Sequence, residues 1–193
     1  HLITSQINGV RGAMRLRMLK SYRASWVSLA ICQHTGIAVS ERYSGGSPEI
    51  DVFAGYIVGW RVSSFMETTF VLDTLEQALW ARRPSDTIHH SDKGSQYVSL
   101  AYTERLKEAK LLASTGSTGD SYDNAMAESI NGLYKAEVIH RKSWKNRAGV
   151  ELVTLTWVDW YNNRRLLGRL GHTPPAEAEK AYYASIGNND LAA

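Results

Sequence analysis

The 193-residue sequence contains one cysteine, four prolines and three phenylalanines, and it has no long hydrophobic run. A lone thiol, Cys32, excludes an internal disulfide and a zinc site built from cysteines. A membrane-spanning helix needs about 20 consecutive apolar residues, so we expect no membrane association. The short apolar stretch that ends at Cys32 is not expected to be a signal peptide, because no convincing cleavage site follows it. These absences favour a cytoplasmic protein.

Acidic residues are scarce at the start of the chain. Residues 1–48 contain no aspartate, and their only acid, Glu41, stands among six Lys or Arg residues. A basic arm can hold a phosphate backbone, although a solvated segment without a function would have the same composition. Residues 1–49 show no helical or strand periodicity, and residues 44–48 form a cluster of helix and strand breakers. We therefore separate residues 1–49 as an unmatched basic N-terminal segment.

From residue 50 onward the hydrophobic pattern alternates between strand and helix periods. The expected strands are residues 50–52 and 56–62, paired as a hairpin, then 87–90 and 111–115. The expected helices are residues 66–82 and 99–109, one capped by Asp123 or Asn124 that runs to about residue 141, residues 147–167, and a terminal helix opened by Pro174-Pro175. This order indicates an α/β protein with a mixed sheet flanked by helices. The core would span residues 50–183, and residues 184–193 would form a tail.

Two acidic residues are set in distinctive peptides. Asp92 lies in His89-His90-Ser91-Asp92-Lys93-Gly94-Ser95-Gln96-Tyr97 and Glu128 in Asp123-Asn124-Ala125-Met126-Ala127-Glu128-Ser129, with 35 residues between the two acids. Carboxylates that hold two divalent cations promote phosphodiester cleavage and transfer, and oxygen ligands suit Mg²⁺ or Mn²⁺. Taken singly, Asp92 could cap a turn and Glu128 could be an exposed helix acid. His89 and His90 could suggest zinc, but no third ligand stands at a suitable spacing.

Helical spacing distributes the residues around Glu128 over two faces. Glu128, Asn131 and Lys135 fall on one face at i, i+3 and i+7, which we expect to face solvent. The opposite face, which we expect to pack in the core, carries Ile130, Leu133, Tyr134 and Val138.

A second cluster of signals lies in the last long helix. Trp157, Trp160 and Tyr161 form a stripe that favours core packing over base stacking. Arg164 and Arg165 follow near the end of this helix, where they could hold phosphate or lie in solvent.

Together these peptides resemble insertion-element DDE transposases with a retroviral-integrase-like catalytic core, the larger reading frame of the third insertion-sequence family. The other peptides that carry the resemblance are Ile50 to Trp60, Trp157 to Arg165 and Thr173 to Glu177. The resemblance extends from about residue 50 to residue 183. It implies an RNase H-like fold, DNA strand cleavage and strand transfer that depend on Mg²⁺, and a homo-multimer bound to element ends and target DNA. Such a protein would work at the nucleoid.

The resemblance also implies roles for individual residues. Asp92 and Glu128 would be the catalytic metal ligands. The residues expected beside the DNA are Lys93, Ser95, Gln96, Asn131, Lys135, Arg164 and Arg165.

The sequence departs from the family pattern at the first acidic ligand. In this family the first Asp lies on the opening strand in a Trp-x-x-Asp peptide, whereas residues 1–48 contain no Asp and Asp51 belongs to the next strand's motif. The missing carboxylate would bridge both cations, so we predict that this copy is inactive or impaired. The opening strand would then be missing or replaced by a strand within residues 25–39. The alternatives are a non-catalytic DNA-binding or transposase-interacting protein, and a nuclease of the same fold.

Overall fold

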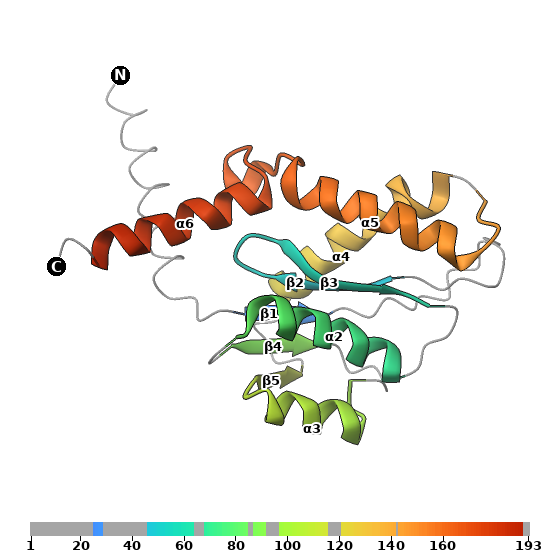
Figure 1. The fold of residues 1–193 in the computed structure, drawn as a ribbon, viewed down its shortest axis with the longest axis horizontal. Coiled ribbons are helices and arrows are strands. Elements are labelled where there is room, and N and C mark those ends of the chain that lie inside the picture. The colour runs from blue at the N-terminus through green and yellow to red at the C-terminus, as the bar shows by residue number, and fades with distance from the viewer. Residues whose placement is uncertain are drawn as a thin grey trace.

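The computed structural model describes residues 25–28, 46–63, 68–84, 87–91, 97–115, 121–141 and 143–190. Five strands form one mixed sheet in the order β3-β2-β1-β4-β5 (Figure 1). The strands are β1 (Ser25–Ser28), β2 (Gly46–Asp51), β3 (Tyr56–Val62), β4 (Ile88–Ser91) and β5 (Leu112–Thr115). The predicted mixed α/β sheet is confirmed, including the hairpin of β2 and β3.

The central strand, β1, comes from the N-terminal segment that showed no periodicity. It pairs antiparallel with β2 and parallel with β4. The expectation that a strand within residues 25–39 replaces the opening strand is therefore confirmed.

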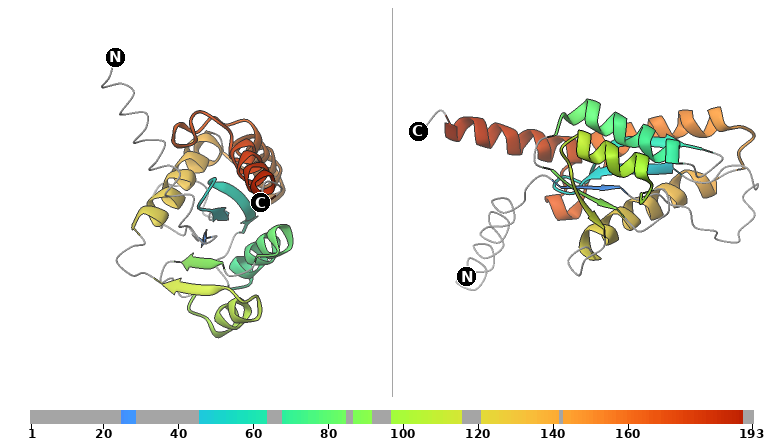
Figure 2. Two further views of the ribbon diagram at one scale, coloured as in Figure 1. Left: turned by 90° about the vertical axis from the view of Figure 1, so that its left-hand side faces the viewer. Right: turned by 90° about the horizontal axis from the view of Figure 1, so that it is seen from below.

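Two pairs of helices cover the two faces of the sheet (Figure 2). The helices α2 (Thr68–Arg82) and α3 (Leu100–Glu108) lie on one face, and α4 (Ser121–Glu137) and α5 (Arg147–Asn163) lie on the other. The last helix, α6 (Pro175–Asp190), contacts α5 and extends away from the sheet (Figure 1). Two 3₁₀ turns complete the described elements, η1 (Ile139–Arg141) and η2 (Gly168–Leu170). None of the helices within these ranges is long and apolar enough to cross a bilayer.

The helix ends differ from the sequence-based predictions at three places. Helix α4 begins at Ser121, before Asp123 and Asn124, so the predicted cap is wrong. Helix α5 ends at Asn163 instead of residue 167, and α6 continues to Asp190, past residue 183. Caps and fraying ends depend on local backbone geometry, which periodicity does not specify.

The sheet separates two hydrophobic clusters. One joins Val58 to α2 and α3 through residues such as Leu75 and Tyr102, and the other joins Ile50 and Ile57 to α4 and α5. Fully burying one such side chain stabilises the fold by about 2 kcal/mol. The predicted aromatic stripe of α5 belongs to the second cluster. Trp157 and Tyr161 are buried there as predicted, whereas Trp160 is 39% exposed.

The close approach of β3 to α2 depends on Gly59. A Cβ atom at this position would lie 2.5 Å from the carbonyl oxygen of Thr74. Any side chain would therefore push the edge strand away from the helix that covers it.

The first half of β2 fits its place in the sheet poorly. Pro48 has no N–H to donate, although it lies opposite Trp60 in the pairing of β2 with β3. Glu49 is completely buried, and neither of its carboxylate oxygens has a hydrogen-bond partner among the described residues. A cavity of about 20 Å³ lies beside Pro48 and is lined by Ile57, Trp60 and Tyr134, among others. The defects end at Ile50, the residue at which the strand and helix periodicity begins.

Candidate functional site

The topology brings the carboxyl ends of β1 and β4 together. Ser28, the last residue of β1, lies opposite Ser91, the last residue of β4, in a parallel pair. Asp92 follows Ser91 directly in the sequence, but residues 92–96 lie outside the described residues. The roles expected for Asp92, Lys93, Ser95 and Gln96 therefore stay predictions.

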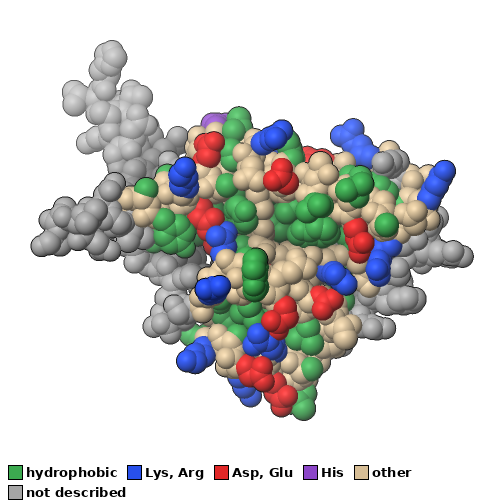
Figure 3. All heavy atoms as spheres, in the orientation of Figure 1, with side chains coloured by type: hydrophobic (Ala, Val, Ile, Leu, Met, Phe, Trp, Pro, Cys, Tyr) green, Lys and Arg blue, Asp and Glu red, His purple; other side chains and the backbone are tan. Residues whose placement is uncertain are grey.

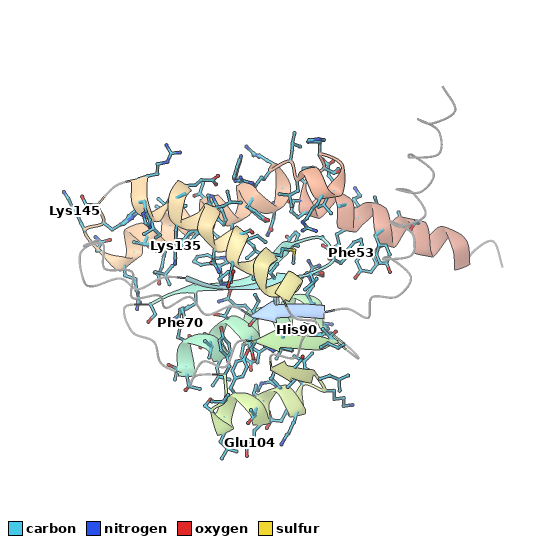
Figure 4. The ribbon with its side chains drawn as sticks, turned by 180° about the vertical axis from the view of Figure 1, so that it is seen from behind. Phe53, Phe70, His90, Glu104, Lys135 and Lys145 are labelled. Carbon is cyan, nitrogen blue, oxygen red and sulfur yellow. The ribbon has the colours of Figure 1, made fainter. Side chains whose placement is uncertain are left out.

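Glu128 lies on α4, the helix that packs against β1 on one face of the sheet. Helix α4 contacts β1, and Figure 4 shows the helix lying against this face. Ala127 and Ile130 are buried beneath the helix, while Glu128 is exposed. The core face anchors the helix and leaves the carboxylate accessible, as the periodicity predicted.

The prediction that Asn131 shares the solvent-facing side of α4 with Glu128 is wrong. Asn131 is only 2% exposed, and its Nδ2 lacks a hydrogen-bond partner among the described residues. A helix turns by about 100° per residue, so Asn131 lies about 60° from Glu128 but about 40° from the buried Ala127. The Asn131 side chain lines the cavity beside Pro48, so DNA cannot contact it in this structure. Lys135, about 20° from Glu128, is half-buried.

No residue of β1 carries a carboxylate, because its sequence is Ser-Trp-Val-Ser. Asp51 does not take the place of the missing acid. It lies opposite Trp26, two residues before the end of β1, and its Oδ1 accepts the N–H of Phe53 at 2.9 Å. Burial raises the pKa of Asp51, against the opposing effects of the Phe53 hydrogen bond and of Arg82. Asp51 therefore stabilises the hairpin turn.

Glu49 is an acid that the periodicity and motif arguments passed over. It lies opposite Ser28, but its side chain points away from α4, toward α3. Its Oε2 is 3.5 Å from Nε2 of His89, which also lies 3.1 Å from the Tyr102 hydroxyl. All three residues are completely buried. Nothing in the breaker-rich sequence around residue 48 signals this buried position.

The histidines do not form a zinc site in the described part of the chain. His89 is surrounded by Glu49 and Tyr102 in the core, and no group of three or more possible metal ligands occurs among the described residues. The weak zinc interpretation of His89 and His90 gains no support.

Arg164 and Arg165 differ in their surroundings. Arg164 is exposed, whereas Arg165 donates from Nη1 to both carboxylate oxygens of Glu137 at 2.8 Å. Trp157 Nε1 donates to the same carboxylate at 2.8 Å, and the Arg165 guanidinium lies over the Trp160 ring, 5.2 Å from its centroid. Arg165 therefore ties the end of α5 to the end of α4. A phosphate contact by Arg164 or Arg165 stays a prediction.

The described part of the site thus supplies one accessible carboxylate. Glu128 offers hard oxygen ligands of the kind that Mg²⁺ prefers, and β4 ends where a second carboxylate, Asp92, is expected. The central strand contributes none. This set can hold a cation only with fewer protein ligands than a two-metal site normally uses.

Comparison with known proteins identifies relatives of most of the chain. Two family models, both described as integrase core domain, match residues 35–121 and 110–175. The chain is 92% identical over 144 residues to the transposase for insertion sequence element IS629 of Shigella sonnei, covering 75% of this chain and 49% of that protein. It is 35% identical over 133 residues to the transposase for insertion sequence element IS904 of Lactococcus lactis, covering 68% and 53%. The chain spans about half the length of these curated relatives.

Solved structures share the fold at low sequence identity. The catalytic core domain of BIV integrase matches with a TM-score of 0.63 and 14% identity, over 86% of this chain and 97% of that one. The HTLV-2 integrase catalytic core domain in complex with magnesium matches with a TM-score of 0.56 and 11% identity, over 80% and 94%. These matches establish the RNase H-like architecture.

Proposed function

Because the chain belongs to the insertion-sequence transposases with an integrase core domain, we propose that it is a transposase catalytic core whose chemistry is impaired. Its family's reaction would be DNA strand cleavage and strand transfer at the ends of the element. One observation carries the proposal: Glu128 is presented on α4 beside a central strand, β1, that has no carboxylate. The chain keeps the fold and one accessible acid, and it has lost the ligand that would bridge two cations.

The metal that suits this site is Mg²⁺, or Mn²⁺ in its place. Asp92 and Glu128 would hold it through carboxylate oxygens, and when bound it would activate the attacking oxygen and stabilise the leaving oxygen. The residues present do not fit a complete two-metal site, since β1 is Ser-Trp-Val-Ser. This copy therefore lacks one of the carboxylates that a complete two-metal site uses.

DNA is the proposed partner, both as element ends and as target. Phosphate contacts would come from basic side chains. Arg164 is exposed and Lys135 is half-buried, whereas Lys93 lies outside the described residues. Ser95 and Gln96 would lie beside the DNA, after β4. Assembly as a homo-multimer on DNA and a place at the nucleoid in the cytoplasm follow from the same proposal.

The misfit in β2 suggests that residues 1–49 derive from another reading frame. The match to the IS629 transposase leaves 49 of the 193 residues uncovered, a number equal to the length of the segment that the sequence separates, whereas the integrase core model matches from residue 35. Translation of the encoding locus in all three frames upstream of the codon for Ile50 tests this origin. A Trp-x-x-Asp strand in another frame would support it, and the absence of such a strand from every frame would refute it.

The activity test is a Mg²⁺-dependent cleavage and strand-transfer assay on DNA that carries the ends of the IS629 element. We expect the chain to bind the DNA and to release little or no product. The control variants are Asp92→Asn and Glu128→Gln in the site, and Glu104→Gln, an exposed acid of α3. Abundant products that disappear in Asp92→Asn and Glu128→Gln but persist in Glu104→Gln would refute impairment and establish an active enzyme.

The absence of a carboxylate from β1 also favours a second function. A chain that keeps the fold and binds DNA without cutting it would act as a non-catalytic subunit, which joins an intact transposase and blocks it. Mixing the chain with the intact transposase separates the two functions. Inhibition that grows with the ratio of this chain to the intact enzyme supports a blocking subunit, and unchanged product formation excludes it.

A further inference from the structure

We infer that the segment between α4 and α5, residues 138–146, and the cations at its borders form a second DNA-binding surface. We call this segment the connector. It would hold the phosphate backbone of a duplex whose reacting end lies at Glu128. The inference rests on the proposed function and adds the connector, residues 138–146, to which none of the motifs assigned a role.

The connector region has an unbalanced charge. Residues 135–147 contain five Lys or Arg and one acid, Glu137. Arg165 already pairs with that acid through two contacts of 2.8 Å. Arg141, Lys145 and Arg147 are exposed. By contrast, acidic and basic side chains are interspersed on the face of the molecule shown in Figure 3.

The ion pair of Arg147 with Glu151 does not cancel this charge. Arg147 lies 3.2 Å from Glu151 at the i, i+4 spacing, and its side chain is 54% exposed. Exposed pairs of this kind contribute little to stability, because water and salt screen the attraction. A phosphate oxygen can therefore compete for the Arg147 guanidinium at little cost.

Two contacts anchor the described residues of the connector to the helices beside it. Trp144 Nε1 donates to the carbonyl of Ile139 at 3.1 Å, and both side chains pack against the core cluster of α4 and α5. Asn146 caps α5 by accepting the N–H of Gly149 at 2.8 Å. Side chains that project from a fixed backbone lose less freedom on binding than those of an unanchored loop.

The position of the connector fits a duplex that runs along α4. Lys135 lies seven residues after Glu128, about 10 Å along the helix axis, and the connector continues in the same direction. Figure 4 shows Lys135 and Lys145 on the same side of the molecule, at the end away from Phe53. Base pairs are spaced by about 3.4 Å, so the connector would meet phosphates several base pairs from the reacting end. Such contacts position the duplex without reading its sequence.

The test compares two charge-removal variants of the full chain. Arg141→Ala with Lys145→Ala removes two exposed connector cations, and Lys107→Ala with Lys110→Ala removes two exposed cations at the end of α3. Both are assayed by fluorescence anisotropy on a labelled duplex of arbitrary sequence over a series of salt concentrations. Equal thermal unfolding midpoints show that each variant keeps its fold.

We expect the connector variant to bind several-fold more weakly than the wild type, with a salt dependence reduced by about one per cation removed. The α3 variant should bind like the wild type. Equal affinities for wild type and connector variant, or equal losses in both variants, would overturn the connector surface and leave the proposed DNA function standing. No binding by the wild-type chain would overturn both.

Discussion

Asn162 of α5 binds both main-chain groups of Ile57 in β3. Its Oδ1 accepts the Ile57 N–H at 2.9 Å, and its Nδ2 donates to the Ile57 carbonyl at 3.0 Å. β3 is an edge strand, and edge strands leave main-chain groups unpaired unless another element covers them. Asn162 is 4% exposed, so this side chain completes the edge of the sheet inside the core.

Replacing Asn162 with alanine is expected to lower the free energy of unfolding by about 2–4 kcal/mol, because two buried main-chain groups lose their partners. The control is Asn163→Ala, since Asn163 is exposed and bonds only to Asp159 in its own helix. Urea denaturation followed by circular dichroism measures both. If the two variants lose the same free energy of unfolding, the hydrogen bonds of Asn162 to the edge strand do not account for the loss.

Glu49 is expected to destabilise the fold, so its replacement by valine should raise the free energy of unfolding by about 1–3 kcal/mol. The carboxylate is completely buried, and neither of its oxygens has a hydrogen-bond partner in the described residues. His89 Nε2 lies 3.5 Å away and is also 3.1 Å from the Tyr102 hydroxyl. Burial without a hydrogen bond outweighs an attraction at this distance.

If Glu49 instead forms a buried ion pair, Glu49→Val should lower the free energy of unfolding. Breaking a buried ion pair costs about 3–5 kcal/mol, so a large loss of stability in Glu49→Val would mean that Glu49 and His89 form such a pair. Glu49→Gln separates charge from shape, because it keeps the volume and removes the charge. We expect the thermal unfolding midpoint of Glu49→Gln to lie between those of the wild type and Glu49→Val.

The sequence alone predicts most of the fold because its periodicity is strong after residue 50. The helix at residues 66–82 forms within two residues of its predicted position wherever these residues are described, and β3 forms at the predicted residues 56–62. By contrast, β2 begins at Gly46, four residues before the predicted start at residue 50. β1 could be placed only within a broad range, since a four-residue strand of Ser-Trp-Val-Ser carries no alternating pattern. Its place at the centre of the sheet depends on tertiary pairing with β2 and β4.

The site was less predictable than the fold. The exposure of Glu128 follows from helical spacing, but the same spacing wrongly placed Asn131 on the exposed face. The hydrophobic pattern of a helix does not mark where its buried face ends and its exposed face begins. The pairing of Arg165 with Glu137 joins residues 28 positions apart, so sequence spacing within one helix cannot predict it.

Glu137 should stabilise the protein in a pH-dependent way. Burial alone would raise the pKa of Glu137, but hydrogen bonds from Arg165 and Trp157 outweigh burial, and the pKa lies below its ordinary value. A carboxyl whose pKa is lowered by folding contributes stability above its unfolded-state pKa, and the contribution is lost as the pH falls through its folded-state pKa. Glu137→Gln should therefore be less stable than wild type by about 1–2 kcal/mol at pH 7, with the difference shrinking below about pH 4.

Chemical denaturation at several pH values between neutral and acid measures this difference. Asp51 and Glu179, whose pKa values burial raises, are present in both proteins and cancel in the comparison. Glu151→Gln is the matched control, because it removes an acid from a more exposed pair with Arg147. A difference between wild type and Glu137→Gln that does not change with pH would rule out the ion pair as its source.

Restoring one carboxylate is expected to recover catalysis. Trp26-Val27-Ser28-Leu29 has the spacing of the family's Trp-x-x-Asp peptide with leucine in place of the acid. Ser28 lies opposite Ser91 in the parallel pair, so Leu29 follows Ser28 just as Asp92 follows Ser91. If the absent ligand limits the reaction, Leu29→Asp should produce Mg²⁺-dependent cleavage of element-end DNA that the wild-type chain lacks.

Adjacent residues of a strand alternate between its two faces, so Ser28→Asp, one position away, is the matched control and is expected not to recover cleavage. The recovered activity must also disappear when Leu29→Asp is combined with Glu128→Gln, since both carboxylates would then be needed on one metal site. Cleavage by Ser28→Asp alone would move the site to the other face of the sheet. If neither variant cleaves DNA while both keep the wild-type unfolding midpoint, a missing carboxylate does not by itself account for the impairment, and the non-catalytic function becomes the better description of this chain.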